Sequence, residues 1–288
     1  MPLVVSFGET VLLGALAGFT IYLGLPFGRI EFVSQRAKVA LAMFSVGVLA
    51  FLFAEVLVHG VGIVEGHFDE LHDGNGSLLE GLALAAVLGV GFTAGSAGLA
   101  LVERRMRTTK PPPITGGATD AMTVEQAEIA AREDLSAKAL RTGMTIAAAI
   151  GLHNFAEGLA IGVSASTGEI GLATVLIIGF AVHNATEGFG ICGPMSGEGT
   201  VPSWGFLVAM GLIGGGPTFL GTLLGNAWSS EAMSVVFFAI AAGSILYVVQ
   251  ELFAVNRRYG HTVLVTWLVL LGILLGFATD FVVSASGI

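Results

Sequence analysis

The sequence predicts an all-α polytopic membrane protein with eight transmembrane helices and with both termini outside the cytoplasm. Three observations predict this fold: the scarcity of charge, the number of long apolar stretches, and the positions of the basic residues. Asp, Glu, Lys and Arg together supply only 11% of the 288 residues, whereas 54% are hydrophobic. Because a soluble domain carries about twice that charged fraction, most of the surface of this protein must face lipid.

The predicted spans are the apolar stretches that are long enough to cross a bilayer, which takes about 20 residues. They lie at about 7 to 25, 38 to 59, 78 to 101, 141 to 163, 169 to 191, 203 to 225, 232 to 254 and 262 to 283. The first stretch has no basic flank and contains Glu9, so we interpret it as a span and not as a cleaved signal peptide. The single cysteine, Cys192, excludes an internal disulfide framework and a cysteine-rich metal site.

The basic residues predict the orientation of the spans. All 12 Lys and Arg residues fall in or beside three predicted loops: Arg29, Arg36 and Lys38; Arg104, Arg105, Arg107, Lys110, Arg132, Lys138 and Arg141; Arg257 and Arg258. Eight alternating spans place these three loops on one side of the membrane, and loops rich in Lys and Arg are retained in the cytoplasm. We therefore expect a multi-pass protein of the cell membrane whose two termini are outside.

The chain is predicted to form a single transmembrane domain, residues 1–288, with one long cytoplasmic loop at 102–140. The loop contains three consecutive prolines, 111 to 113, and then Gly116 and Gly117, which exclude regular helix. The segment from Thr123 to Leu140 has helical spacing, which predicts an amphipathic helix leading into the fourth span. Thr123 and Gln126 have the spacing of a capping box.

Acidic and histidine side chains near the outer ends of the spans are candidates for the path of a cation. His67 and His72 belong to an acidic stretch that is predicted to be the loop between the second and third spans. This stretch is either a low-affinity collector of cations or an ordinary solvated loop. Glu55, near the outer end of the second span, either lines the path from outside or is an interfacial carboxylate. Asp280 is interpreted as interfacial.

Two polar motifs lie in the fourth and fifth predicted spans, as HNFAEG and, 30 residues later, as HNATEG. Each motif contributes a histidine, an asparagine and a glutamate: His153, Asn154, Glu157, His183, Asn184 and Glu187. A charged residue at the centre of a membrane helix costs roughly 2.5 to 3.5 kcal/mol, and no Lys or Arg lies inside a predicted span to compensate. The partner that remains is a bound cation.

Helix geometry and ligand chemistry predict what this cation is. At about 100° per residue, the glutamate of each motif points between the histidine and the asparagine. Two facing helices therefore offer six ligands, enough for one or two metal ions. Imidazole and carboxylate without thiolate fit zinc, iron(II), manganese, cobalt or cadmium better than copper(I), magnesium or calcium. We expect a transported divalent metal, with zinc first, and no cofactor. The alternative is that these side chains only hydrogen-bond one another across the helix interface.

At these residues the chain resembles the ZIP family of zinc and iron transporters, which has an HNxPEG string in the fourth helix and a related string in the fifth. The resemblance extends over most of the chain, including GLPFGR at the end of the first span. It implies that the six motif residues bind the transported metal, that one helix bundle slides against another, and that homodimers form. Gln250 and Glu251 lie where relatives often have polar ligands, so Glu251 either lines an exit path or is interfacial.

The sequence departs from the family pattern at three positions. Ala156 and Thr186 stand where the motifs of the family have proline, which predicts a weaker kink. Gly216 precedes Pro217 in the sixth span, where some members have a glutamate, so a second metal ion is left open.

An intramembrane zinc-dependent hydrolase is the alternative function from another class. Zinc proteases of the HExxH type have a general base beside the first histidine, whereas Asn154 and Asn184 cannot abstract a proton. We therefore expect no enzyme. A metal-binding channel or sensor would use the same ligands, and the sequence leaves both open. Within transport we expect uptake toward the cytoplasm rather than efflux, with lipid and divalent metal as partners and no nucleic acid.

Overall fold

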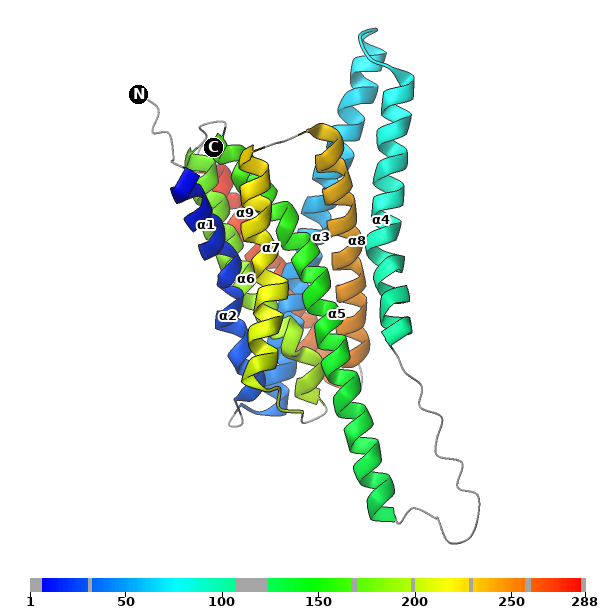
Figure 1. The fold of residues 1–288 in the computed structure, drawn as a ribbon, viewed down its shortest axis with the longest axis vertical. Helices are drawn as coiled ribbons and strands as arrows, with labels where there is room; N and C mark the ends of the chain where they lie inside the picture. The colour runs from blue at the N-terminus through cyan, green and yellow to red at the C-terminus, as the bar shows by residue number, and fades with distance from the viewer. Residues whose placement is uncertain are drawn as a thin grey trace.

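The structure is a computed structural model that describes residues 7–30, 33–106, 124–166, 170–197, 200–227, 230–256 and 260–285. Its helices are α1 (Phe7–Phe19), α2 (Ile21–Gly24), η1 (Leu25–Arg29), α3 (Gln35–His72), α4 (Leu78–Met106), α5 (Val124–Ser166), α6 (Ile170–Gly197), α7 (Trp204–Ala227), α8 (Glu231–Asn256) and α9 (Thr262–Ala285). Figure 1 shows a bundle of long helices in which α1 begins and α9 ends at the same end, where α3 also joins α4.

Seven helical segments of the described chain are long and apolar enough to cross a membrane. The prediction of an all-α membrane protein is therefore confirmed. Helix α6 is not among the seven, although it has 28 residues; its side chains are described only from Phe180 to Met195. The number of eight spans stays a prediction.

Helix α3 is longer than the predicted second span, and the predicted loop position of His67 and His72 is wrong. Both histidines lie on the last turns of α3, which ends only at His72. Hydropathy falls beyond residue 59, but Val64, Phe68 and Leu71 keep the i, i+4, i+7 spacing of a helical apolar stripe. Val64 is buried, and the ring of Phe68 packs near Gly81 of α4. The stripe therefore extends the helix past the predicted end of the span.

The helix predicted before the fourth span is confirmed from Val124 onward, but its described side chains from Gln126 to Lys138 are exposed except for Ser136, so its amphipathic character stays a prediction. Helix α5 begins at Val124, and it continues without interruption to Ser166 through the first motif. Thr123, the three prolines and the two glycines lie outside the described residues, so the capping box and the linker stay predictions. The first predicted span consists of α1, α2 and η1. Helices α1 and α2 are separated at Thr20, whose Oγ1 donates to the Ala17 carbonyl at 2.6 Å.

The helices form two bundles, each held together by glycines. The first bundle is α1, α2, η1, α5, α6 and α7; the second bundle is α3, α4, α8 and α9. In the first, a methyl group on Gly158 would collide with the Thr218 carbonyl of α7; in the second, one on Gly47 would collide with the Val269 carbonyl of α9. Small residues at such points let helix backbones approach closely in a membrane, so each bundle is tightly packed.

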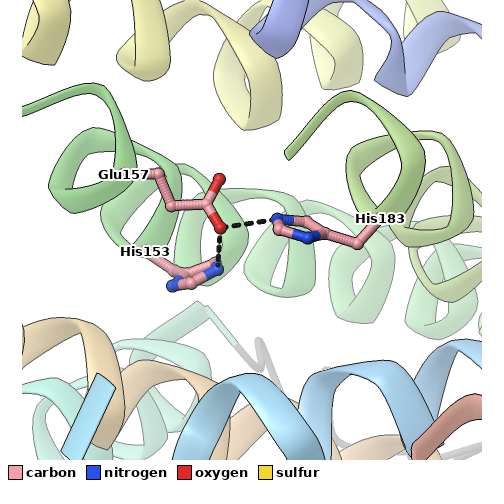
Figure 2. A group of neighbouring side chains, drawn as sticks. All are labelled: His153, Glu157 and His183. Atoms are coloured by element: carbon pink, nitrogen blue, oxygen red, sulfur yellow. Dashed lines mark hydrogen bonds and ion pairs between the residues drawn. The ribbon is translucent and has the colours of Figure 1, made fainter. Parts of the chain in front are cut away.

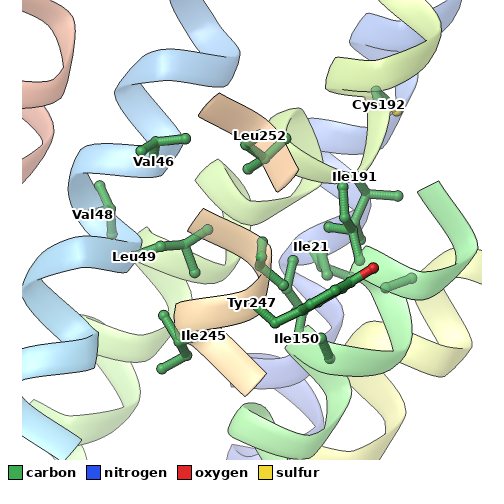
Figure 3. Packing of buried hydrophobic residues seen from close by; sticks show 14 of the residues in the cluster. Ile21, Val46, Val48, Leu49, Ile150, Ile191, Cys192, Ile245, Tyr247 and Leu252 are labelled. Carbon is green, nitrogen blue, oxygen red and sulfur yellow. The ribbon is translucent and has the colours of Figure 1, made fainter. Parts of the chain in front are cut away.

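The contact between the two bundles is made by side chains. Gly190 and Gly193 face from α6 toward the second bundle, and their nearest neighbours are side-chain atoms of Ser45, Ala42 and Leu252. Leu252 and other fully buried apolar residues of α3, α5, α6 and α8 form the core at this contact, as Figure 3 shows. At the glycines of the described chain, backbone carbonyls lie close by inside each bundle, whereas side chains lie close by between the two bundles.

Replacing Gly95 with alanine is expected to destabilise the protein, whereas replacing Gly98 on the same helix is not. A methyl group on Gly95 would collide with the Ile240 carbonyl of α8, and one on Gly98 meets no atom within 4 Å. Overpacking of this kind costs about 1–3 kcal/mol. Thermal unfolding in detergent should give a lower midpoint for Gly95→Ala and an unchanged or higher one for Gly98→Ala. Equal midpoints would contradict the packing of α4 on α8.

Candidate metal centre

Helices α5 and α6 bring three side chains of the two motifs together. His153 and Glu157 lie one turn apart on α5, and His183 faces them from α6 (Figure 2). Glu157 Oε1 is 2.9 Å from His153 Nε2 and accepts a hydrogen bond of 2.5 Å from His183 Nε2. One ligand atom from each residue lies within 4.8 Å of the others. One carboxylate oxygen thus contacts two imidazoles from two different helices.

The three side chains are removed from solvent. His153, Glu157 and His183 are 0%, 5% and 4% exposed. Glu157 Oε2 and His153 Nδ1 have no hydrogen-bond partner within the described part of the chain, and unsatisfied buried groups of this kind are costly. Two neutral imidazole nitrogens and a carboxylate are the donors that zinc and similar divalent metals take in proteins. The cluster can therefore hold one such ion.

Glu187 and Asn154 border this cluster. Glu187 Oε1 is 4.0 Å from His153 Nε2. Its other oxygen, Oε2, accepts a hydrogen bond of 3.2 Å from Asn154 Nδ2, which also donates to the Gly214 carbonyl of α7 at 3.0 Å. The cluster and Glu187 beside it thus account for four of the six motif residues. Asn154 links Glu187 to α7.

Asn184 joins α6 to α1. Its Nδ2 donates to the Ala17 carbonyl of α1 at 2.9 Å. A backbone carbonyl can only accept a hydrogen bond, so the amide nitrogens of Asn154 and Asn184 must point at Gly214 and Ala17. Sequence reasoning treats the two asparagines as metal ligands; in the structure their nitrogens join the motif helices to α7 and α1.

The comparison with protein families agrees with this geometry. The family model described as ZIP Zinc transporter matches residues 3–284 of the chain. The chain belongs to the ZIP family. No curated protein matches it. The resemblance stated from the two motifs is therefore confirmed, and the chain is an integral membrane protein of a family that transports divalent metals such as zinc. A family of transporters does not favour the alternative of an intramembrane hydrolase.

A small cavity of this ZIP protein joins the cluster to side chains of the second bundle. It has a volume of about 50 Å³ and is lined by His183 together with Glu55, Thr279 and Asp280. Glu55 and Asp280 are half-buried, on α3 and α9. Sequence reasoning singles out Glu55 but interprets Asp280 as interfacial. The sequence alone does not predict that Glu55 and Asp280 line one cavity, because it does not show which face of α9 packs against α3.

The other candidate path residues of this ZIP protein lie elsewhere. His67 Nε2 is 3.6 Å from Glu231 Oε2 of α8, and His72 is exposed at the end of α3. On α8, Gln250 is exposed and Glu251 is half-buried. Among the described residues, none of these four lines the cavity or belongs to the cluster. Their part in a path for the metal ion therefore stays a prediction.

The residues that replace the prolines of the ZIP motifs leave both helices continuous. Helices α5 and α6 run through Ala156 and Thr186 without a break. Thr186 Oγ1 donates to the His183 carbonyl at 2.7 Å. Because His183 belongs to the cluster, this bond restrains the turn of α6 that carries the His183 side chain.

Proposed function

We propose that this ZIP protein carries zinc into the cytoplasm and that His153, Glu157 and His183 bind the ion in the middle of the membrane. The observation that carries the proposal is the single Glu157 oxygen that contacts two buried imidazoles from different helices. A mixed shell of nitrogen and oxygen donors suits zinc, and the same shell suits iron(II), manganese, cobalt and cadmium. Glu187, beside the cluster, adds the second negative charge that a divalent ion requires.

The cavity at Glu55 and Asp280 supports a route to the cluster from outside. Asp280 lies close to the end of α9, at the same end of the bundle at which α1 begins (Figure 1). Two carboxylates in a half-buried cavity attract a dication from water, and His183, which lines the same cavity, belongs to the cluster. An ion therefore meets oxygen ligands before it meets nitrogen.

On the opposite side of the cluster, apolar packing supports a closed route to the cytoplasm. The Leu252 side chain of α8 is fully buried and lies over Gly190 and Gly193, which follow Glu187 on α6. Ile191 and Leu49 are also fully buried in this core (Figure 3). A route that has a cavity with two carboxylates on one side and is sealed on the other is what alternating access requires of one of its two states.

The positions of the basic residues support the proposed sidedness. Arg104 and Arg105 at the end of α4, and Arg132 and Lys138 near the start of α5, lie at the end of the bundle opposite the start of α1 (Figure 1). Because cationic ends are retained in the cytoplasm, we propose that both termini are outside and that eight spans cross the cell membrane. Homodimer formation stays a prediction from the family resemblance.

The proposal is tested with proteoliposomes that contain a zinc-sensitive dye. We expect zinc influx that saturates with external zinc, and a higher KM with little change in kcat for Glu55→Gln, because this residue acts before the central site. Influx that rises in proportion to zinc without saturation would indicate a channel, and saturable binding without influx would indicate a sensor. In cells that express the protein, a fall in zinc content would reverse the proposed direction.

A further inference from the structure

A cavity with a volume of about 540 Å³ lies at one end of the second bundle, apart from the metal cluster and the proposed route. Its lining comes from α3, α8 and the start of α9. Helix α8 ends and α9 begins at the end of the molecule opposite the start of α1 (Figure 1). Sites for small molecules in proteins have volumes of about 300–1,000 Å³, so this cavity is large enough for a ligand.

One part of the lining is apolar. Met43 of α3 is fully buried, and Phe253 of α8 and Val265 of α9 are half-buried. The side chains of these residues come from three different helices and present only carbon and sulfur atoms to the cavity. A hydrocarbon chain that lies against them is removed from water, which is favourable.

The other part of the lining is polar and carries no negative charge. It includes His261, which is exposed, and Thr262, the first residue of α9. The His261 carbonyl accepts a hydrogen bond from the Val265 amide, so the amides of the first turn of α9 point toward this end of the helix and lack an acceptor inside it. Such a helix start attracts phosphate groups. Within the described chain, no Asp or Glu lines the cavity to repel one.

Asn256 adds a buried polar side chain to the same cavity. It is 2% exposed, and its Nδ2 donates to the Leu252 carbonyl of its own helix at 2.9 Å. The amide oxygen, Oδ1, is therefore the atom that Asn256 offers to a ligand. Because buried polar atoms are normally paired, this oxygen favours a ligand that has a hydroxyl group near its phosphate.

The polar and apolar parts of the lining follow each other in the order in which an amphiphile would meet them. On α9, Val265 lies one turn deeper in the bundle than Thr262, and on α8, Phe253 lies one turn deeper than Asn256. On both helices the polar residue is thus nearer to the end of the bundle and the apolar residue nearer to its middle.

The start of α9 lies at the depth of the lipid head groups. Val263 and Trp267 are 74% and 60% exposed on this apolar helix, so this side of α9 faces lipid, and Trp is enriched where a membrane meets water. Trp267 follows Thr262 by five residues, which corresponds to about 8 Å along a helix. A phosphate at Thr262 is therefore at the level of the head groups, next to the lipid from which it comes.

We propose that this cavity binds one anionic phospholipid of the leaflet that surrounds this end of the molecule. The phosphate lies at the start of α9 beside His261, and a hydroxyl of the head group donates to Asn256 Oδ1. An acyl chain lies against Met43, Phe253 and Val265. The lipid joins α3, α8 and α9, so it stabilises the second bundle. Its binding is independent of the proposed zinc transport and is tested without zinc.

The test is a thermal unfolding series with the purified full-length protein in detergent and EDTA. Dioleoylphosphatidylglycerol, dioleoylphosphatidylcholine and soluble glycerol 3-phosphate are added at equal concentrations. We expect a saturable rise of the unfolding midpoint with phosphatidylglycerol and a much smaller rise with the other two. Superimposable curves for the two lipids would overturn the proposal, because the head group would then not be recognised. A full rise with glycerol 3-phosphate would overturn it as well, because the acyl chain would then not contribute.

Substitutions on α9 locate the lipid. Val265→Phe fills the apolar part of the cavity and is expected to raise the half-saturating concentration of phosphatidylglycerol at least about tenfold. Val263→Phe is the matched control, because Val263 is on the same helix but outside the lining. An unchanged response in a folded Val265→Phe protein would place the lipid elsewhere.

His261→Ala decides the question if Val265→Phe does not fold, because the exposed His261 side chain is not needed for packing. We expect this variant to need more phosphatidylglycerol for half-saturation than the wild type. His72→Ala, which removes an exposed histidine at the end of α3, should respond as the wild type does. Equal half-saturation in His261→Ala and His72→Ala would refute the site.

Discussion

Replacing Glu157 with glutamine is expected to abolish zinc uptake. Oε1 of this residue contacts both His153 Nε2 and His183 Nε2, so the substitution removes a charge that is shared by the two halves of the cluster. The loss of one partner of a buried charged contact costs about 2–5 kcal/mol, which corresponds to at least about a 30-fold loss of affinity. Zinc influx into proteoliposomes, normalised to the amount of folded protein, measures the effect.

Glu65→Gln is the control for this substitution. Glu65 is an exposed carboxylate of α3, and its loss changes the net charge by the same amount without touching the cluster. We expect its influx to equal that of the wild type. A folded Glu157→Gln protein that still transports zinc at the wild-type rate would exclude the cluster as the central site.

Zinc is expected to raise the thermal stability of the wild-type protein, and magnesium at the same concentration is not. A ligand that binds only the folded state stabilises it by about 2.7 kcal/mol at 100 times its dissociation constant. His153 and His183 supply nitrogen ligands, which zinc accepts and magnesium does not. The unfolding midpoint in detergent is measured against metal concentration.

The variant Glu157→Gln separates this binding from adsorption at the surface. Its zinc-dependent rise should disappear, while Glu65→Gln keeps the full rise. If magnesium stabilises the wild type as much as zinc does, the imidazoles do not contribute to binding, and the assignment of the cluster is wrong.

The repeated motif made the cluster of histidine and glutamate side chains predictable. Polar groups that recur in adjacent apolar spans require a partner, and helix periodicity places histidine and glutamate on one face. Three of the six motif residues, His153, Glu157 and His183, lie together as the spacing indicates. Their approach across α5 and α6 follows from the sequence only as an expectation, because one sequence does not give the packing of helices.

The roles of the asparagines were not predictable in the same way. The bonds from Asn154 and Asn184 go to backbone carbonyls of Gly214 and Ala17. Every residue has a backbone carbonyl, so no side-chain pattern marks these acceptors.

Span prediction gave the helices but not their ends. Hydropathy measures how well a segment dissolves in lipid, and it ends the second span where polar residues appear. Helix α3 continues because the apolar side chains of Val64, Phe68 and Leu71 still share one face. Periodicity in the outer segment would have been the better signal, since a helix needs only one buried face to continue past the membrane.

From the division of the helices by glycine contacts we expect that the helices of one bundle move together with the ion. All three ligands proposed for zinc lie on α5 and α6, inside the first bundle, whereas Glu55 and Asp280 belong to the second. We expect the first bundle to move as one body while the second bundle stays in place, so that the ion keeps the same ligands. The ion then loses contact with Glu55 and Asp280 once, when it enters the central site. The distances between the ion and its ligands need not change while it crosses the membrane.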